Sequence, residues 1–316
     1  MLRFLAHRFT AALVTLFIVS TLIFAIIPLL PGDPVLILLG EQAVSSPEVV
    51  AKVRHQLRLD QPLHAQYLGW LQGLVRLDFG VSLQNAVPVA QEIRTRIPRS
   101  LELIAASLLI AAAIGIPLGA VGARTPASPL GWLSALMAVV GLSTPVFVTG
   151  VVLVVVFSLQ LGLFPSSGYV PPVEDLAGHL LYAVLPAVTL GFGFIGVVVR
   201  MTRASLLDVL GKAYVRTARA KGLPERRVVY RHALSNALVP VITVLGVRAA
   251  NLLGGMVIVE SFFNWPGLSS LLVRSAYDRD YPMLQGALFS IFAMFVLISL
   301  LIDLLHGLLD PRVRPE

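Results

Sequence analysis

Long uncharged apolar segments alternate in this sequence with short segments that carry most of the charged residues. A helix that crosses a bilayer needs roughly 20 apolar residues. The uncharged run at residues 125–173 is too long for one crossing, so we place one span in its first part and a loop after it. The pattern predicts six membrane-spanning helices, at residues 9–30, 103–123, 131–158, 176–199, 236–259 and 283–302. The first follows Arg3 and Arg8 like a signal peptide, but its length and the lack of a cleavage site predict a retained signal anchor.

Residues 31–98, between the first two spans, carry helix signals of their own. Ser46 followed by Pro47 and Glu48 is typical of a helix start, and Gln61-Pro62 marks a second one. Apolar residues then recur at helical spacing after both points. Such amphipathic helices either lie on the membrane–water boundary or pack together as a small cap, and the sequence leaves both alternatives open.

The composition and the distribution of charge agree with a membrane protein and orient it. Of the 316 residues 57% are hydrophobic and 13% are charged, whereas soluble domains carry about 25% charged residues. A net charge of +7 is typical either of a nucleic-acid-binding protein or of a membrane protein with basic cytoplasmic loops. The distribution of the basic residues along the chain distinguishes these two classes. With the N-terminus inside, the inner segments hold 14 Lys or Arg residues against two in the short outer loops. We therefore expect both termini in the cytoplasm of a bacterial or archaeal cell, and no nucleic-acid partner.

Familiar catalytic and nucleotide-binding motifs are missing or misplaced. Residues 191–196 fit G-x-G-x-x-G, but they lie inside an apolar run. Glycines in such a run are expected to let helices approach closely, as are Gly115 and Gly119. Gly211-Lys212 lacks the remainder of a phosphate-binding loop. The chain has no cysteine, and its six histidines suggest no metal cluster. These observations leave an integral-membrane enzyme unsupported.

One dense basic stretch, AYVRTARAKGLPERRVVYRHALSNAL at residues 213–238, stands out. Ser205 and Asp208 predict a helix start, and one apolar and one basic stripe then continue at helical spacing as far as Ala220. Gly222 ends this helix, and Pro224 begins the next. The stretch therefore predicts a helix–glycine–helix unit on the cytoplasmic side, and its composition alone would favour contact with anionic lipid.

The order of residues in this stretch resembles the cytoplasmic loop of permease subunits in ABC importers of the dipeptide, oligopeptide and nickel group. Gly222 takes the place of the family's loop glycine, and residues 216–218 stand where the wider family has E-A-A, of which only Ala218 remains. The segment RTARAKGL resembles the sequence typical of the peptide group at this place. Ser235 stands where the wider family has a proline. Further similar segments, in family order, are PLLPGDP, DFGVSL, LSTPVF, LFPSSGY and VESFFNWPGL, so that the resemblance covers nearly the whole chain and points to the first of the two permeases.

The resemblance implies an all-α, six-span permease of the type I ABC importer fold, without catalytic residues or a cofactor of its own. Its implied partners are a second homologous permease, two ATP-binding subunits that hold ATP and Mg²⁺, an extracytoplasmic solute-binding protein and membrane lipid. We divide the chain into residues 1–30, 31–98 and a five-span core at 99–316, with the coupling loop at 200–235. The expected coupling helix, which docks on an ATP-binding subunit, consists of Ala213, Tyr214, Arg216, Thr217, Ala218, Arg219, Ala220, Lys221, Gly222 and Leu223.

The alternative function is a secondary transporter driven by an ion gradient. Such transporters often have inverted repeats and acidic ion sites, whereas this chain shows no clear repeat and almost no acids within its spans. Arg248 lies near the middle of the fifth span, where a charge is costly unless it faces protein or water. We expect Arg248 and Asn251 to line the translocation path, with an ion pair to the partner permease as the alternative for Arg248. Peptides are the expected solute; nickel chelates, glutathione and oligosaccharides use related permeases.

Overall fold

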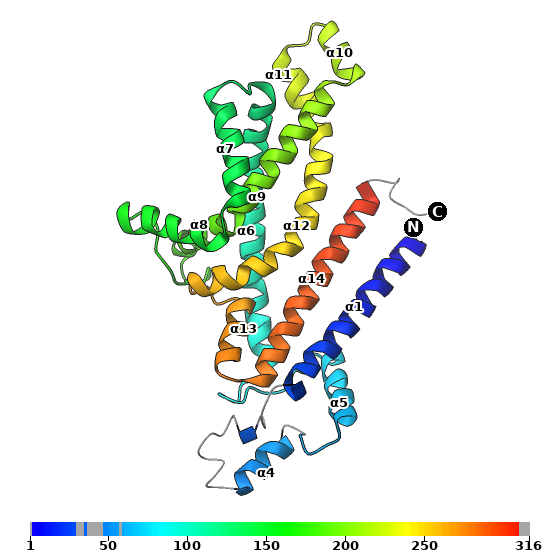
Figure 1. Ribbon diagram of the computed structural model, residues 1–316, viewed down its shortest axis with the longest axis vertical. Coiled ribbons are helices and arrows are strands. Elements are labelled where there is room, and N and C mark those ends of the chain that lie inside the picture. The colour runs from blue at the N-terminus through cyan, green and yellow to red at the C-terminus, as the bar shows by residue number, and fades with distance from the viewer. Residues whose placement is uncertain (1, 30–34, 37–46, 57–58, 310–316) are drawn as a thin grey trace. The chain divides into compact units, whose positions relative to one another are not determined.

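The computed structural model describes residues 2–29, 35–36, 47–56 and 59–309 (Figure 1). Within these ranges all regular structure is helical, apart from one isolated antiparallel bridge between Val81 and Pro88, so the all-α prediction is confirmed. The chain divides into two compact units. The first comprises Met1–Pro98, Gly267–Leu300 and Arg314–Glu316, and the second comprises Arg99–Pro266 and Leu301–Val313.

The number of spans agrees with the prediction. Among the described residues, five helices are long and apolar enough to cross a membrane, and a bent helix pair makes a sixth when it is counted as one span. Four of the five belong to α1 (Leu2–Leu29), α6 (Val89–Arg124), α9 (Leu176–Leu210) and α14 (Tyr281–Leu309). The other lies within the helical run formed by α11 (Glu225–Arg227), a π-helical stretch, η2 (Val228–Ala233), and α12 (Leu234–Phe262). The charged residues at the start of this run precede its apolar part.

The prediction of one continuous helix at residues 131–158 is wrong. Two helical segments occupy this region, α7 (Pro129–Ser143) and α8 (Val146–Leu153), and the second continues as a π-helical stretch, η1 (Val154–Gln160). They are bent by 117° at the break. Thr144 precedes Pro145 and has extended backbone angles, φ −85° and ψ 122°, because a proline ring disfavours helical angles in the residue before it. The uniform apolar composition of this region hid the break.

The second span also begins earlier than its apolar run. Helix α6 starts at Val89, so residues 89–98 belong to this helix although the sequence analysis placed them in the outer segment. Val89 and Ile93 are buried, and a Cβ added to Gly286 of α14 would lie 2.6 Å from Val89 Cγ1. Hydropathy reports only the part of a helix that matches the hydrocarbon, and this first part of α6 is stabilised by protein packing instead.

A helix start at Ser205 is likewise wrong. Ser205 lies inside α9, which continues without interruption from the fourth span to Leu210. Its hydroxyl donates a hydrogen bond to the carbonyl oxygen of Ala237 on α12, at 2.9 Å, and so links the two helices. Leu206 and Val209 are buried, and this apolar side keeps α9 helical beyond the span. A serine caps a helix only where the chain enters it, and the break comes later, at Gly211 and Lys212.

In the first unit, both helices expected between the first two spans are present. They are α4 (Pro47–Gln56) and α5 (Leu63–Val75), with Pro62 preceding the second, as predicted. Helix α5 packs on α1: the Tyr67 hydroxyl lies 2.6 Å from that of Thr21, and the Phe24 ring centroid lies 5.2 Å from that of Tyr67. This contact favours the packed cap for one face of α5, while Leu68 on the same helix stays exposed.

Another part of the first unit ties the start of α14 to the segment before α6. After α13 (Leu268–Tyr277), the buried Asp280 accepts a hydrogen bond from the Ser82 hydroxyl at 2.5 Å and from the Leu83 amide at 3.2 Å. It also accepts one from the Met283 amide at 3.4 Å, in the first turn of α14. A buried carboxylate is stable here because three donors satisfy it.

In the second unit, α6, α7 and α9 pack closely through glycines (Figure 1). A Cβ added to Gly115 would lie 2.7 Å from Val198 Cβ, and one added to Gly119 would lie 2.7 Å from Thr202 Cβ. A Cβ at Gly196 would lie 3.1 Å from the Met137 carbonyl oxygen. The expectation that these glycines let the helices approach closely is confirmed, and the result is a tightly packed support for the end of α9.

Candidate functional site

The basic stretch forms a short separate helix, α10 (Ala213–Ala220), at one end of α9 and α12 (Figure 1). It begins after Lys212, whose backbone is extended, and no side chain caps it. It ends at Lys221 and Gly222, where the Gly222 amide donates to the Arg219 carbonyl at 2.9 Å. Gly222 has φ +74°, a conformation that favours glycine, and Pro224 then precedes α11, so the predicted end and restart are confirmed.

Eight residues are too few for a stable isolated helix, so α10 depends on packing against its neighbours. Val215 is fully buried in a cluster contributed by α6, α9, η2 and α12. Ala218 and Leu223 are half-buried against the same cluster. Burial of one valine stabilises this arrangement by about 1.5 kcal/mol or more. The cluster consists of Ala120, Ala123, Leu206, Val209, Val215, Val228, Val229, Ala233 and Ala237.

Polar contacts fasten α10 on both sides of its glycine. The Asn236 amide donates to the Tyr214 hydroxyl at 3.1 Å, which links α10 to α12. Arg219 forms two hydrogen bonds to the Glu225 carboxylate, at 3.0 and 2.7 Å, across the turn that contains Gly222. These hydrogen bonds from Arg219 lower the pKa of Glu225 and raise that of Arg219. At neutral pH both groups are charged, and the pair braces the corner between α10 and α11.

The opposite side of α10 is bare. Ala213, Arg216, Thr217 and Ala220 are exposed, and all of them except Arg216 have small side chains. Arg216 bends back to donate to the Gly211 carbonyl at 3.1 Å. Seven of the ten residues expected in the coupling helix lie in α10, and Lys221, Gly222 and Leu223 form the turn that follows it. The helix has one anchored side and one accessible side. The accessible side combines small residues with positive charge, a surface suited to close contact with another protein.

The two residues expected in the translocation path are placed only in part. Arg248 and Asn251 lie within the bounds of α12, but their side chains are outside the part of the chain that the structure describes. Their role stays a prediction from the sequence.

Two buried polar contacts escaped the sequence analysis. Glu260 is fully buried in α12, and the Ser100 hydroxyl of α6 donates to it at 2.6 Å. His179 of α9 is almost fully buried; one ring nitrogen contacts the Glu102 carboxylate, and the other lies 2.7 Å from the Val170 carbonyl oxygen. The sequence does place an acidic residue, Glu260, directly after an apolar run. Because the predicted span ended at residue 259, Glu260 was assigned to the outer loop and its burial was not expected.

Within the described ranges, no group of three or more His, Asp or Glu side chains is arranged to hold a metal ion.

Comparison with known proteins gives matches along the chain. The family model described as binding-protein-dependent transport system inner membrane component matches residues 115–315. The model of the N-terminal part of such membrane components matches residues 1–104. The chain is 37% identical over 337 residues to the dipeptide transport system permease protein DppB of Escherichia coli (strain K12), covering 99% of each protein. It is 40% identical over 314 residues to the glutathione transport system permease protein GsiC of the same strain, again covering 99% of each.

Proposed function

The chain belongs to the family of binding-protein-dependent transport system inner membrane components, and we propose that it forms half of an ATP-driven import path together with a second homologous permease. It is an ABC importer permease subunit rather than an enzyme or an ion-driven secondary transporter. The alternative function weighed from the sequence is therefore set aside.

In the proposed arrangement, α10 docks on one of two ATP-binding subunits, which hold ATP and Mg²⁺. The observation that carries this proposal is the geometry of α10: an eight-residue helix, anchored through the buried Val215, presents its bare side away from the bundle. Because α9 and α12 are both fastened to α10, movement of a docked subunit would move these two helices together. Such rigid-body coupling is a known way to drive alternating access.

The charge asymmetry supports an orientation with both termini and α10 in the cytoplasm. The segments around α4, α5 and α13 then face outward and receive a solute-binding protein.

Short peptides are the solute class that we propose. The two relatives are named for dipeptide and glutathione transport, and glutathione is itself a short peptide with free carboxylates. Arg248 and Asn251 are three residues apart in the sequence. A cation in the path would attract a peptide carboxylate, which is consistent with this class.

Reconstitution tests the proposal. The tagged chain is purified with its partners, inserted into liposomes and supplied with labelled dipeptides, glutathione or a nickel chelate, each with the solute-binding protein. We expect uptake that needs both ATP and the binding protein, with peptides as the preferred solute. Uptake of the nickel chelate alone would contradict the peptide class but not the coupling role of α10.

A further inference from the structure

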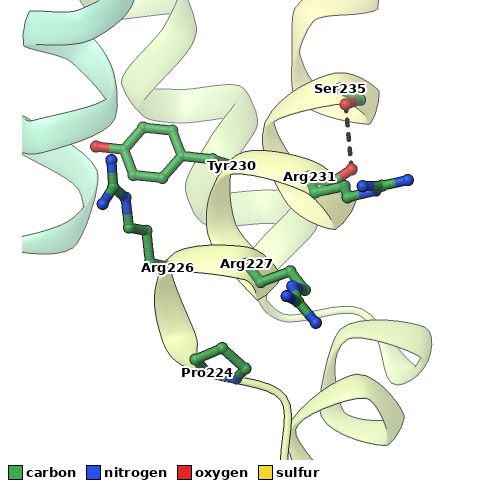
Figure 2. Close-up of a pocket in the computed structure, with 6 residues that line it drawn as sticks. All are labelled: Pro224, Arg226, Arg227, Tyr230, Arg231 and Ser235. Carbon is green, nitrogen blue, oxygen red and sulfur yellow. Dashed lines mark hydrogen bonds between the residues drawn. The ribbon is translucent and has the colours of Figure 1, made fainter.

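Charged and aromatic side chains gather at both ends of α9. At the end beside α10, Figure 2 shows an open basic hollow, which belongs to the loop already expected to meet an ATP-binding subunit. The residues that line it are Pro224, Arg226, Arg227, Tyr230, Arg231 and Ser235. At the opposite end of α9 lies a group of side chains to which the proposed function gives no role. We call it the His179 cluster, and it consists of Arg99, Glu102, Tyr169, His179 and Trp265.

The His179 cluster fastens a strap, residues 161–175, which joins η1 to α9. Tyr169 of the strap packs edge-on against the rings of Trp265 and His179, at centroid distances of 4.8 and 5.5 Å. The guanidinium carbon of Arg99 lies 4.7 Å from the centroid of the same tyrosine ring, within reach of a cation–π contact. One strap residue therefore contacts α6, α9 and the segment after α12, all within the second unit.

His179 is almost fully buried, and both of its ring nitrogens face oxygen atoms. Nδ1 lies 2.7 Å from the Val170 carbonyl oxygen of the strap, and Nε2 contacts the Glu102 carboxylate. A neutral imidazole has one N–H group, so beside a carboxylate it satisfies one contact and turns a lone pair toward the other oxygen. Both contacts are satisfied when the pair carries one more proton. The proton then makes either an imidazolium beside a carboxylate or a neutral imidazole beside a carboxylic acid.

The other titratable groups packed around this ring have contacts of their own. Arg99, on α6, lies over the face of the Tyr169 ring, and Tyr169 meets the imidazole edge-on. The Asp175 carboxylate caps α9 by accepting a hydrogen bond from the Gly178 amide at 3.0 Å. The additional proton is therefore shared between the imidazole and Glu102. The Glu102 side chain is 37% exposed, so this proton can exchange with the solvent.

We propose that the proton shared by His179 and Glu102 latches the strap, which is held at low pH and released as the pH on its side of the membrane rises. The latched strap binds one proton more than the released strap, and a state that binds more protons loses stability as the pH rises. Loss of the proton leaves a buried ring nitrogen facing an oxygen with no hydrogen between them, which favours release by about tenfold.

Release of the strap frees α6, α9 and the segment after α12 from their common contact. The latch therefore sets, according to pH, whether these three elements move as one body during transport. It goes beyond the proposed function and rests on it only for the orientation, which places the strap outside the cell, and for the uptake assay.

The mobility of the strap tests the latch without ATP or solute. Ser167 is exposed and lies two residues before Tyr169, and the chain has no cysteine, so Ser167→Cys takes a spin label at one site. The whole complex is studied in nanodiscs, with any cysteines of the partner chains replaced by serine. Spectra are recorded from about pH 5 to about pH 9, a range that includes the ordinary charge change of histidine.

Three variants separate the proton from the packing. In Glu102→Gln, the new amide donates to Nε2 while Nδ1 donates to Val170, so a neutral imidazole satisfies both contacts. His179→Ala removes both contacts. His55→Gln is the matched control, because His55 lies 2.7 Å from the Asp60 carboxylate but is exposed on α4.

In the otherwise unchanged chain, the ratio of immobilised to mobile label should fall by about tenfold per pH unit over the range in which one proton leaves. Glu102→Gln should keep the label immobilised throughout, His179→Ala should leave it mobile throughout, and His55→Gln should respond like the unchanged chain. The same pH response with and without Glu102→Gln would overturn the proposal, and so would a label whose mobility does not change with pH.

Solute uptake tests the regulatory role of the latch. In liposomes with a fixed inner pH, uptake by the wild type should fall several-fold more than uptake by Glu102→Gln as the outer pH rises. An equal fall in both would contradict the regulatory role. Failure of the wild type to take up solute at every pH would instead contradict the proposed function, and the spin-label result would still decide whether the latch exists.

Discussion

Replacement of Gly222 by valine separates the role of the α10 turn from general stability. Gly222 has φ +74°, and an added Cβ would have no heavy atom within 4 Å. The added Cβ therefore meets no neighbouring atom, and the expected effect is backbone strain. We expect the strain to loosen the turn that separates α10 from α11.

The magnitude follows from the left-handed conformation. An L-residue with a Cβ loses about 1–2 kcal/mol there, which changes the equilibrium between the native and a distorted turn by a factor of about 5–30. Asparagine tolerates this conformation better than valine does, so Gly222→Asn should have a smaller effect. The order of effects is valine, then alanine, then asparagine, because a β-branched residue is the least tolerant.

The assay measures ATP hydrolysis and solute uptake in parallel, in liposomes with the solute-binding protein. We expect Gly222→Val to insert and assemble normally, to hydrolyse ATP, and to lose most of the uptake per ATP hydrolysed. Gly162 offers a matched control, because it has φ +62° and equally open surroundings but lies in the loop after η1. Gly162→Val carries the same strain and should leave coupling intact.

The reasoning is refuted if Gly222→Val retains wild-type uptake and wild-type stimulation of ATP hydrolysis. It is also refuted if both valine variants lose coupling equally, since strain anywhere in the chain would then suffice.

Four further outcomes are expected. Val215→Ala should loosen α10 by about 1–3 kcal/mol through the cavity it leaves, measured as faster proteolysis of the loop. Arg219 lowers the pKa of Glu225, so their ion pair stabilises the corner between α10 and α11 at pH values above the ordinary pKa of a glutamate. As the pH falls through the lowered pKa, this contribution of at most about 1 kcal/mol should be lost. Proteolysis of the loop at a series of pH values, compared with the Glu225→Gln variant, measures the loss. Arg248→Gln should reduce uptake of peptides with a free carboxylate more than that of amidated ones; equal loss together with failure to co-purify the second permease would indicate an ion pair instead. A cysteine at Gln84 should react with an impermeant reagent from the outside, and labelling from the cytoplasm alone would contradict the orientation.

The number and approximate position of the spans could be predicted because each span needs a long uncharged run. The turn at Gly222 could be predicted because glycine and proline leave few conformations open to the chain. Both signals are local, and both were confirmed. The proposed role of α10 rests on the order of residues in its loop, not on their composition.

The predictions that were wrong depend on contacts between distant residues. Serine is a favoured helix-capping residue, yet Ser205 lies in a continuous helix because Leu206 and Val209 pack on neighbouring helices. The bend at Thr144 and Pro145 lies in a run whose hydropathy is uniform, so hydropathy does not reveal it, and Pro145 was the local signal that went unused. The buried contact between Glu260 and Ser100 joins two helices far apart in the sequence, and a pattern along one helix does not show it.

Cross-linking from α10 tests the central claim most directly. The chain has no cysteine, so Thr217→Cys, on the exposed side of α10, gives a single reactive site. In membranes that contain the assembled complex, a short photoreactive cross-linker attached there should join α10 to an ATP-binding subunit, and the yield should change when ATP is added. Products with lipid alone, or with the solute-binding protein, would contradict the claim that α10 couples ATP hydrolysis to transport.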